Sequence, residues 1–196
     1  ALERWAKKVS TAGFLTGQGT AMESAMERLI LMRHGKAERH AQSGGDFERA
    51  LVDSGRADAA VMGRILIDAG VSPDLLLVSS ARRTRETAEQ VLAARDQRSR
   101  VEHLRDLYHA DPEDILQALE DYGEGAGVVM VVGHNPGLHE LTLRLAVQGG
   151  ASPIQTNKLR GRFPTATVAV FAWSGQGAPV LEHLFYAHEH GGAGGE

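Results

Sequence analysis

Three short polar clusters contain the side chains of this sequence that are best suited to chemistry. Arg33 and His34, then Arg83, and finally His134 and Asn135 each lie within a few residues of the end of an apolar run. Guanidinium groups bind phosphate through paired, charge-assisted hydrogen bonds. A histidine held among cations has a lowered pKa, so at neutral pH its imidazole is uncharged and keeps a lone pair that can attack phosphorus. If the three clusters meet in space, phosphoryl transfer is the chemistry that they could perform.

The apolar runs before these clusters are typical of buried strands, and helical patterns separate them. Strands are predicted at 29–32, 74–79 and 128–132, with a weaker one at 100–104 and two closing strands, a possible hairpin, at 165–173 and 179–186. Helices are predicted over 53–70, 82–94, 111–123 and from 137 onward. Asp53 or Ser54 is expected to cap the first of these helices, and Gly70 to end it.

This alternation predicts the fold class. Strands that are apolar throughout and are separated by helices indicate an α/β fold, a doubly wound, mainly parallel sheet with helices on both faces. In such sheets ligands bind in the crevice beyond the carboxyl ends of the strands. Because all three polar clusters follow strands, we expect them to converge at one edge of the sheet.

The polar clusters also carry a family resemblance. The sequence resembles the histidine phosphatase superfamily, which includes the phosphoglycerate mutases, and within it the short SixA-like branch. The resemblance rests on five segments in family order: "LMRHGKAE" (31–38), "ERALVDSG" (48–55), "SSARRTRETAE" (79–89), "VVGHNPG" (131–137) and "FPTATVAVFAW" (163–173). It implies a phosphoglycerate mutase-like fold over residues 26–190 and metal-independent phosphatase activity without a cofactor.

Carried over to the matching positions, the resemblance implies a role for each polar residue. His34 would be the nucleophile that becomes phosphorylated, Arg33 and Arg83 would hold the phosphoryl oxygens, and His134 would complete the pocket. Asn135, beside His134, is a further substrate-binding candidate. Arg83 is preferred to Arg82 because it stands four residues before Thr87, as the arginine of the motif does.

The leaving group decides which substrate class such a site could process. An alkoxide leaving group needs a proton donor, whereas imidazole can depart neutral once its other nitrogen is protonated. In the matching region Asp106 is a weak candidate for a general acid, and Asp111 is better explained as a helix cap. The sequence therefore favours a phosphohistidine phosphatase that acts on a phosphorylated protein. The alternatives are a small-molecule phosphomonoesterase acting on a phosphorylated metabolite, a mutase, and a weakly active phosphate-binding regulatory module.

Composition limits the partners and the compartment. The chain has 196 residues, a net charge of −4 with interleaved acids and bases, and no cysteine. These features argue against nucleic acid as a partner and suit a reducing cytoplasm. No apolar run approaches the ~20 residues of a membrane span, so no membrane partner is expected. Residues 1–25 are interpreted as an extension or a cloning remnant, and the tail 191–196 as disordered. His183, His188 and His190 are interpreted as surface histidines and not as metal ligands.

Overall fold

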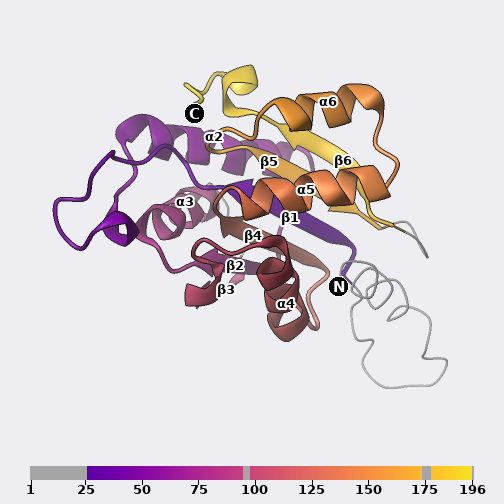
Figure 1. The fold of residues 1–196 in the computed structure, drawn as a ribbon, viewed down its shortest axis with the longest axis horizontal. Helices are drawn as coiled ribbons and strands as arrows, with labels where there is room; N and C mark the ends of the chain where they lie inside the picture. Colours follow the sequence, from indigo (N-terminus) through magenta and orange to yellow (C-terminus); the bar gives the residue numbers. More distant parts are fainter. Residues whose placement is uncertain (1–25, 95–97, 174–177, 196) are drawn as a thin grey trace.

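A six-stranded sheet forms the centre of the protein (Figure 1). The structure is a computed structural model that describes residues 26–94, 98–173 and 178–195. The strand order is β3-β2-β4-β1-β5-β6. The first four strands in this order are parallel to one another, and β5 runs antiparallel to both β1 and β6. The strands are β1 (Arg28–Arg33), β2 (Leu75–Ser79), β3 (Arg100–Leu104), β4 (Val128–Gly133), β5 (Val168–Ala172) and β6 (Val180–Phe185). The mainly parallel sheet predicted from the sequence is confirmed.

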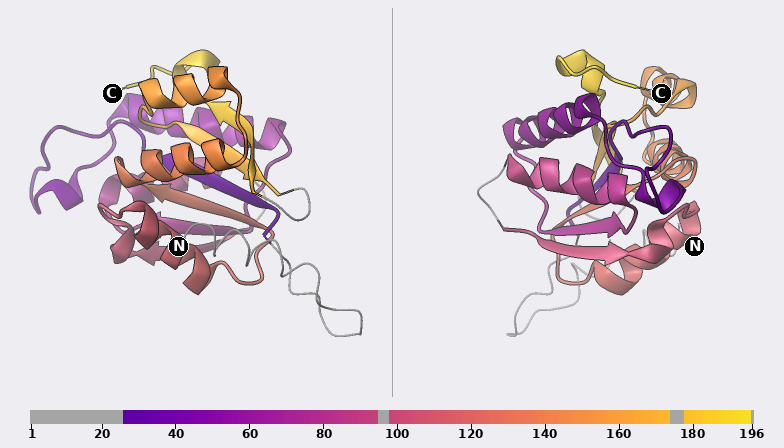
Figure 2. Two further views of the ribbon diagram at one scale, coloured as in Figure 1. Left: turned by 45° about the vertical axis from the view of Figure 1, so that its right-hand side comes forward. Right: turned by 90° about the vertical axis from the view of Figure 1, so that its left-hand side faces the viewer.

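Helices cover both faces of this sheet (Figure 2). On one face, α2 and α3 pack against the strands, and on the other α4, α5 and α6 do so. The α-helices are α2 (Asp53–Asp68), α3 (Arg82–Ala93), α4 (Pro112–Tyr122), α5 (Gly137–Gln148) and α6 (Pro153–Gly161). Three short 3₁₀ helices complete the description: η1 (Asp46–Glu48), η2 (Arg105–Leu107) and η3 (Ala187–His190). The doubly wound arrangement is therefore also confirmed.

Successive side chains of the central strands point to opposite faces of the sheet, so two hydrophobic cores form. In β1, Leu29 and Leu31 point into the core beneath α4 and α5, whereas Ile30 and Met32 point into the core beneath α2 and α3. All four side chains are fully buried. This burial on both faces explains why the strand reads as an uninterrupted apolar run in the sequence. The edge strand β3 is partly exposed along its length, which explains its weaker sequence signal.

Of the two helix ends predicted for α2, the C-terminal one is present and the N-terminal cap is not. Gly70 follows α2 with a φ of +69°, the left-handed conformation expected of a residue that ends a helix. The start of α2 differs from the expectation, because Val52 occupies the cap position and no side chain caps the helix. The backbone N–H of Val52 donates to the carbonyl of Lys36, which fixes the chain before the helix. The side-chain cap predicted at Asp53 or Ser54 is therefore absent, and Val52 precedes the helix in its place.

Helix α6 was not predicted from the sequence, although a local signal was present. Ser152 caps it and Pro153 occupies its first turn. Gln155 donates its backbone N–H to the Ser152 hydroxyl and accepts the backbone N–H of Ser152 in return. This Ser-Pro-x-Gln pattern is a capping box. The helix is only 9 residues long, Leu159 is the only apolar side chain that it buries, and Ile154 is exposed, so its apolar periodicity is weak.

The C-terminal residues differ from the disordered tail that the composition suggests. The backbone N–H groups of Ala193 and Gly194 donate to the carboxylate of Asp58, at 2.8 and 3.1 Å. The carbonyl of Gly195 accepts the N–H of Thr165. Hydrogen bonds to a buried carboxylate thus hold a segment that composition alone cannot place. The expected extension 1–25, residue 196 and the middle of the predicted hairpin lie outside the described residues.

Candidate active site

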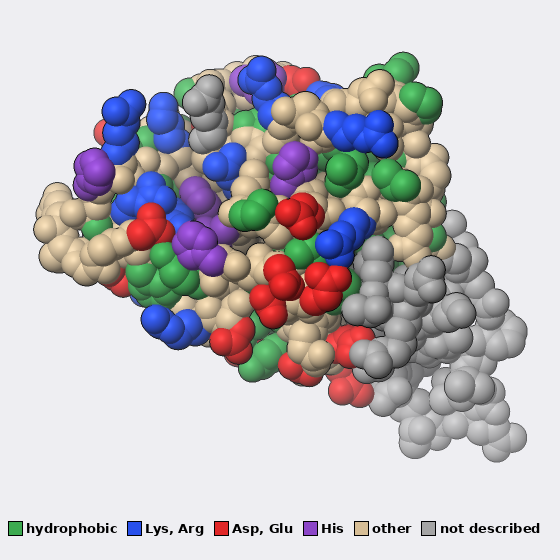
Figure 3. Space-filling view, in the orientation of Figure 1, with side chains coloured by type: hydrophobic (Ala, Val, Ile, Leu, Met, Phe, Trp, Pro, Cys, Tyr) green, Lys and Arg blue, Asp and Glu red, His purple; other side chains and the backbone are tan. Residues whose placement is uncertain are grey.

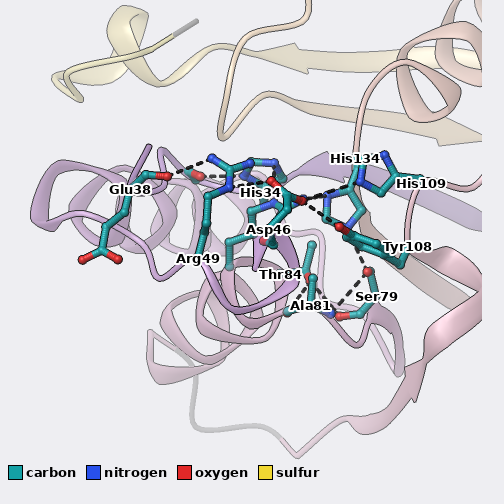
Figure 4. Close-up of polar contacts among 12 residues, drawn as sticks. His34, Glu38, Asp46, Arg49, Ser79, Ala81, Thr84, Tyr108, His109 and His134 are labelled. Atoms are coloured by element: carbon teal, nitrogen blue, oxygen red, sulfur yellow. Dashed lines mark hydrogen bonds and ion pairs between the residues drawn. The ribbon is translucent and has the colours of Figure 1, made fainter. Parts of the chain in front are cut away.

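The three polar clusters of the sequence meet at the carboxyl ends of β1, β2 and β4. Figure 4 shows His34 and His134 close together at this edge. His34 follows β1, His134 follows β4, and Arg83 lies in the first turn of α3 after β2. The ring centroids of His34 and His134 are 5.2 Å apart. Arg83 joins the two rings, because its Nε donates to Nε2 of His34 at 3.3 Å and its Nη2 donates to Nδ1 of His134 at 3.2 Å. The convergence expected from the topology is therefore present.

The hydrogen bonds of His34 define which of its nitrogens is available. Nδ1 lies 2.7 Å from the carbonyl oxygen of Gly35, which can only accept, so Nδ1 carries the proton. Nε2 accepts from Arg83 and therefore holds the lone pair. The N–H of Gly35 in turn donates to the hydroxyl of Thr87 on α3. These contacts fix the ring and point the nitrogen that holds the lone pair at a guanidinium group.

The glycine after His34 serves helix packing more than ligand approach. A β-carbon on Gly35 would lie 2.5 Å from the carbonyl oxygen of Gly55, in the first turn of α2. A β-carbon on Gly55 would in turn overlap the carbonyl of Lys36. The two glycines therefore let α2 cross directly against the chain that leaves β1.

His34 is held uncharged by its surroundings. Its side chain is 8% exposed. Burial, opposed by the hydrogen bond to the Gly35 carbonyl and assisted by the positive charges of Arg83 and Arg33, lowers the pKa of His34 to about 3. Desolvation and nearby cations both disfavour imidazolium, so the neutral ring predominates at physiological pH.

His134 is fixed by a second hydrogen bond. Its Nε2 lies 2.8 Å from Oγ of Ser79, the last residue of β2. Since Nδ1 accepts from Arg83, Nε2 must carry the proton and donate it to the Ser79 hydroxyl. Burial, together with neighbouring His34 and Arg83, lowers the pKa of His134 to about 2. Both histidines of the pair are therefore neutral.

Arg33 and Asn135 share one acceptor beside the histidine pair. Arg33 Nη1 and Asn135 Nδ2 both donate to the carbonyl oxygen of Phe163, at 2.8 and 2.9 Å. Arg33 influences His34 through its charge, and in this structure its guanidinium bonds to Phe163. Nε of Arg33 and Oδ1 of Asn135 are buried without a hydrogen-bond partner among the described residues. The two side chains thus form a second polar group next to the first.

The structure adds an acidic residue that sequence reasoning missed. Asp46, in η1, accepts hydrogen bonds from the Tyr108 hydroxyl at 2.7 Å and from Arg83 Nη2 at 3.2 Å (Figure 4). Arg49 donates to its other oxygen at 2.7 Å. The hydrogen bond from Tyr108, together with the charges of Arg83 and Arg49, holds the pKa of Asp46 well below its usual range. A carboxylate anion therefore occupies one side of the Arg83 guanidinium.

Two aromatic rings complete the wall around His134. The Tyr108 ring contacts the His134 ring edge-on, with centroids 5.5 Å apart. The His109 ring stacks parallel to the His134 ring, with centroids 5.8 Å apart. Both residues come shortly after β3, the fourth parallel strand, and so reach the same sheet edge. The rule that site residues follow the carboxyl ends of parallel strands therefore also applies to Tyr108 and His109. Sequence reasoning missed both residues because the strand signal at 100–104 is weak. For Asp46 the sequence offers only a polar, glycine-containing segment without periodicity.

The weak general-acid candidate lies away from the histidine pair. Asp106, in η2, is exposed, and no hydrogen bond or ion pair within the described ranges connects it to His34, Arg83 or His134. Its neighbours Tyr108 and His109 reach the site instead. Within the described part of the chain, no group of three or more histidine, aspartate or glutamate side chains is arranged to hold a metal ion. No helix among these residues is both long and apolar enough to cross a membrane.

The arrangement is suited to attack on an anionic electrophile. A neutral imidazole with a directed lone pair can act as a nucleophile. Fixed guanidinium donors can neutralise charge on three equatorial oxygens of a transferring phosphoryl group. The parts needed for phosphoryl transfer are therefore gathered within one site.

Comparisons with known proteins agree with this chemistry. A family model described as "Histidine phosphatase superfamily (branch 1)" matches residues 29–122. An uncharacterized chloroplastic protein of Arabidopsis thaliana is 31% identical over 172 residues, which cover 82% of this chain and 78% of that protein. A crystal structure from Agrobacterium tumefaciens, assigned to the phosphohistidine phosphatase SixA, is 29% identical with a TM-score of 0.69, covering 82% of this chain and 97% of that one. A protein histidine phosphatase SixA complexed with tungstate is 26% identical with a TM-score of 0.66, covering 83% and 98%.

Proposed function

The chain belongs to the histidine phosphatase superfamily, and we propose that it hydrolyses phosphohistidine on a protein through a phosphorylated His34. Phosphatase activity as such follows from the family and from the SixA neighbours. The identity of the nucleophile, the roles of the surrounding residues, independence from metal ions and the substrate are our proposals. The observation that carries them is the single available lone pair of His34, on Nε2, facing the Arg83 guanidinium.

The reaction consists of two in-line displacements at phosphorus. In the first, Nε2 of His34 forms a bond to phosphorus as the bond to the leaving group breaks. A leaving imidazole departs neutral because its other nitrogen already carries a proton, whereas a leaving alkoxide would need a proton from a donor. In the second, water attacks phospho-His34, the N–P bond breaks, and inorganic phosphate forms. Arg33 and Arg83 hold the phosphoryl oxygens throughout, and the hydrogen bond from Nδ1 to the Gly35 carbonyl stabilises the developing positive charge on the His34 ring.

The acid-base properties of the site support a phosphoramidate substrate. Expulsion of an alkoxide requires a proton donor, because its pKa is roughly that of water, about 15.7. Asp106 is exposed and outside the site, and the lowered pKa of Asp46 keeps that carboxylate ionised. Imidazole has a pKa of about 6.5 and leaves with far less assistance. A phosphorylated histidine of a protein therefore suits this site better than an alkyl phosphate does.

A small phosphorylated metabolite remains the second candidate, supported by a specific feature. A cavity of about 680 Å³ lies beside Arg33 and Asn135. This size falls within the range of small-molecule sites, roughly 300–1,000 Å³. A flat protein-docking surface would not need such a cavity.

Phosphoenzyme trapping tests the proposal. The full chain is mixed briefly with a labelled phosphohistidine protein and quenched, and the expected product is acid-labile, base-stable phosphate on the wild-type protein. His34→Ala should carry none, whereas the matched variant His103→Ala, which removes an exposed histidine of β3, should label like wild type. Label retained on His34→Ala would refute the assigned nucleophile. Ligand binding without labelling of the wild type would identify a phosphate-binding module instead.

A substrate panel then separates the two candidates. kcat/KM is compared for the phosphohistidine protein, for sugar phosphates and for an aryl phosphate, all measured with added chelator. A preference of at least about 100-fold for the phosphohistidine protein is expected, equivalent to roughly 2.7 kcal/mol in transition-state binding. A preference for sugar phosphates would favour the metabolite phosphatase. Loss of all turnover on chelation would contradict metal independence.

A further inference from the structure

The cavity beside Arg33 is separate from the histidine pair but touches the same arginine. None of His34, Arg83 and His134 lines it. Its walls come from the turn after β4, from α5, from the chain after α6, from η3 and from the C-terminal segment. The lining residues are Arg33, Asn135, His139, Gly161, Arg162, Phe163, Pro164, His188, Ala193, Gly194 and Gly195. A substrate with its phosphoryl group on Arg33 would therefore have space for its remaining part here.

The lining has a one-sided charge. Two arginines, Arg33 and Arg162, contribute to it, and none of the lining residues is aspartate or glutamate. The protein as a whole is acidic, with a net charge of −4. On the face seen in Figure 3, acidic side chains gather over α4, away from the upper region in which most blue and purple side chains lie. The cavity is therefore a local cationic site on an anionic molecule.

Arg162 is a cation of this cavity that has no acidic partner among the described residues. It is exposed, and it makes no ion pair with any acidic residue in the described ranges. Lys158, one turn earlier on α6, is instead paired with Glu189 at 2.7 Å. The Arg33 guanidinium is already bonded to the Phe163 carbonyl. Arg33 therefore keeps part of its guanidinium, including the unpartnered Nε, for the phosphoryl group, whereas Arg162 is free to pair with a second group of the ligand.

The C-terminal segment closes one side of the cavity, and Asp58 holds it in place. The Asp58 side chain is 1% exposed and accepts the backbone N–H groups of Ala193 and Gly194. Gly195 then packs so tightly that an added β-carbon would lie 2.9 Å from Oγ1 of Thr165 and 3.3 Å from the Lys36 side chain. The wall is therefore built by specific contacts, which makes the cavity a defined site.

We propose that this cavity binds a second anionic group of the substrate, a carboxylate or a phosphate on the leaving portion, and that Arg162 selects for it. The inference rests on the proposed function, because the phosphoryl group must be held by Arg33 for the rest of the substrate to reach the cavity. A guanidinium fork pairs with either anion in the same geometry. The expected substrate class is therefore a phosphorylated compound or segment with an acidic group close to the phosphoryl group.

Matched aryl phosphates test this selection on the full chain. Phenyl phosphate is compared with phenyl phosphates that carry a carboxylate or a phosphonate at the 3- or 4-position. The ratio of kcat/KM between a charged and the uncharged substrate is measured in wild type, Arg162→Gln and Arg162→Glu. Comparing ratios between variants cancels intrinsic differences in leaving-group reactivity. The control is Arg160→Gln, which neutralises an exposed arginine of α6 that does not line the cavity.

The expected result is a preference for at least one charged substrate that falls about tenfold in Arg162→Gln, in keeping with one charge-assisted hydrogen bond. Arg162→Glu should lower it further, and Arg160→Gln should leave it unchanged. Phenyl phosphate is the reference substrate in every protein, and its turnover should be unchanged in Arg160→Gln. An unchanged ratio in both Arg162 variants, or an equal fall in Arg160→Gln, would overturn the inference. Absence of phosphoenzyme with phenyl phosphate would instead contradict the proposed function.

Discussion

Oδ2 of Asp46 lies 3.2 Å from Nη2 of Arg83, the nitrogen that also donates to His134 at the same distance. A second tie joins the same residues, because Arg83 Nη1 donates to the backbone carbonyl of Asp46 at 2.8 Å. The carboxylate thus stands beside the guanidinium that is proposed to hold a phosphoryl group. Two anions at this arginine repel each other, so Asp46 should compete with phosphate.

Asp46→Asn tests that competition. At about 4 Å two unit charges repel by about 1 kcal/mol in water and about 4 kcal/mol near a protein surface. We therefore expect inorganic phosphate to inhibit the variant at a concentration roughly fivefold to tenfold lower than wild type. The measurement is the inhibition constant with an aryl phosphate as substrate. A higher inhibition constant would mean that Asp46 mainly orients Arg83 and does not compete with the ligand.

Ser79→Ala should impair catalysis through His134. Removing the hydroxyl leaves the Nε2 proton of His134 buried without its acceptor, which costs about 1–3 kcal/mol. The ring can then turn or change tautomer, and kcat should fall about tenfold with a smaller change in KM. Ser80→Ala is the matched control, since the neighbouring Ser80 is tied to the fold by its backbone N–H. Nitrogen-15 chemical shifts of the His134 ring would report the tautomer directly, and unchanged shifts would argue against this explanation.

The neutral histidine pair makes stability depend on pH. The pKa values of His34 and His134 in the folded protein, about 3 and about 2, lie below the ordinary value of about 6.5. Below pH 6.5 the unfolded chain therefore binds up to two more protons than the folded one, so stability is full above that pH and decreases as the pH falls. Between pH 6 and pH 5 the loss should be about 2 kcal/mol from these two residues.

Urea unfolding at pH 7, 6 and 5 measures this dependence. The free energy of unfolding should fall more steeply from pH 6 to 5 than from pH 7 to 6. His34→Gln should flatten the slope by about half, because one titrating group is lost. A free energy of unfolding that stays constant down to pH 5 would show that the histidines accept protons in the folded state.

Sequence reasoning located the strand-end residues better than the residues between elements. His34, Arg83 and His134 were predictable because each follows a strand, and parallel strands bring their carboxyl ends to one edge. Asp46 was not predictable, because polar contacts with Arg83 and Arg49 fix its position. Arg83 is distant in the sequence, and neither contact leaves a periodic pattern of apolar residues. The phosphoglycerate mutase-like fold itself was predictable from the buried strands and the ordered motifs.

Helix α6 and the C-terminal segment show a second limit of prediction from the sequence. Ser152 and Gln155 carried a capping signal for α6 that the weak apolar pattern did not reinforce. Asp58 lies in the middle of α2, where an acidic residue is normally taken to be solvated, yet it is buried and holds Ala193 and Gly194. The partners of this carboxylate are backbone groups more than 130 positions away, and no local pattern encodes them.

The anchoring of the C-terminal segment by Asp58 has a practical consequence. Gly195 lies against Thr165 and the Lys36 side chain and lines the cavity, so a bulky group attached to this segment would lie close to the proposed binding site. Affinity tags, fluorescent fusions or resin attachment at that end would crowd incoming substrates. The first described residues enter β1 from the opposite edge of the sheet, which makes that side the better point for immobilisation.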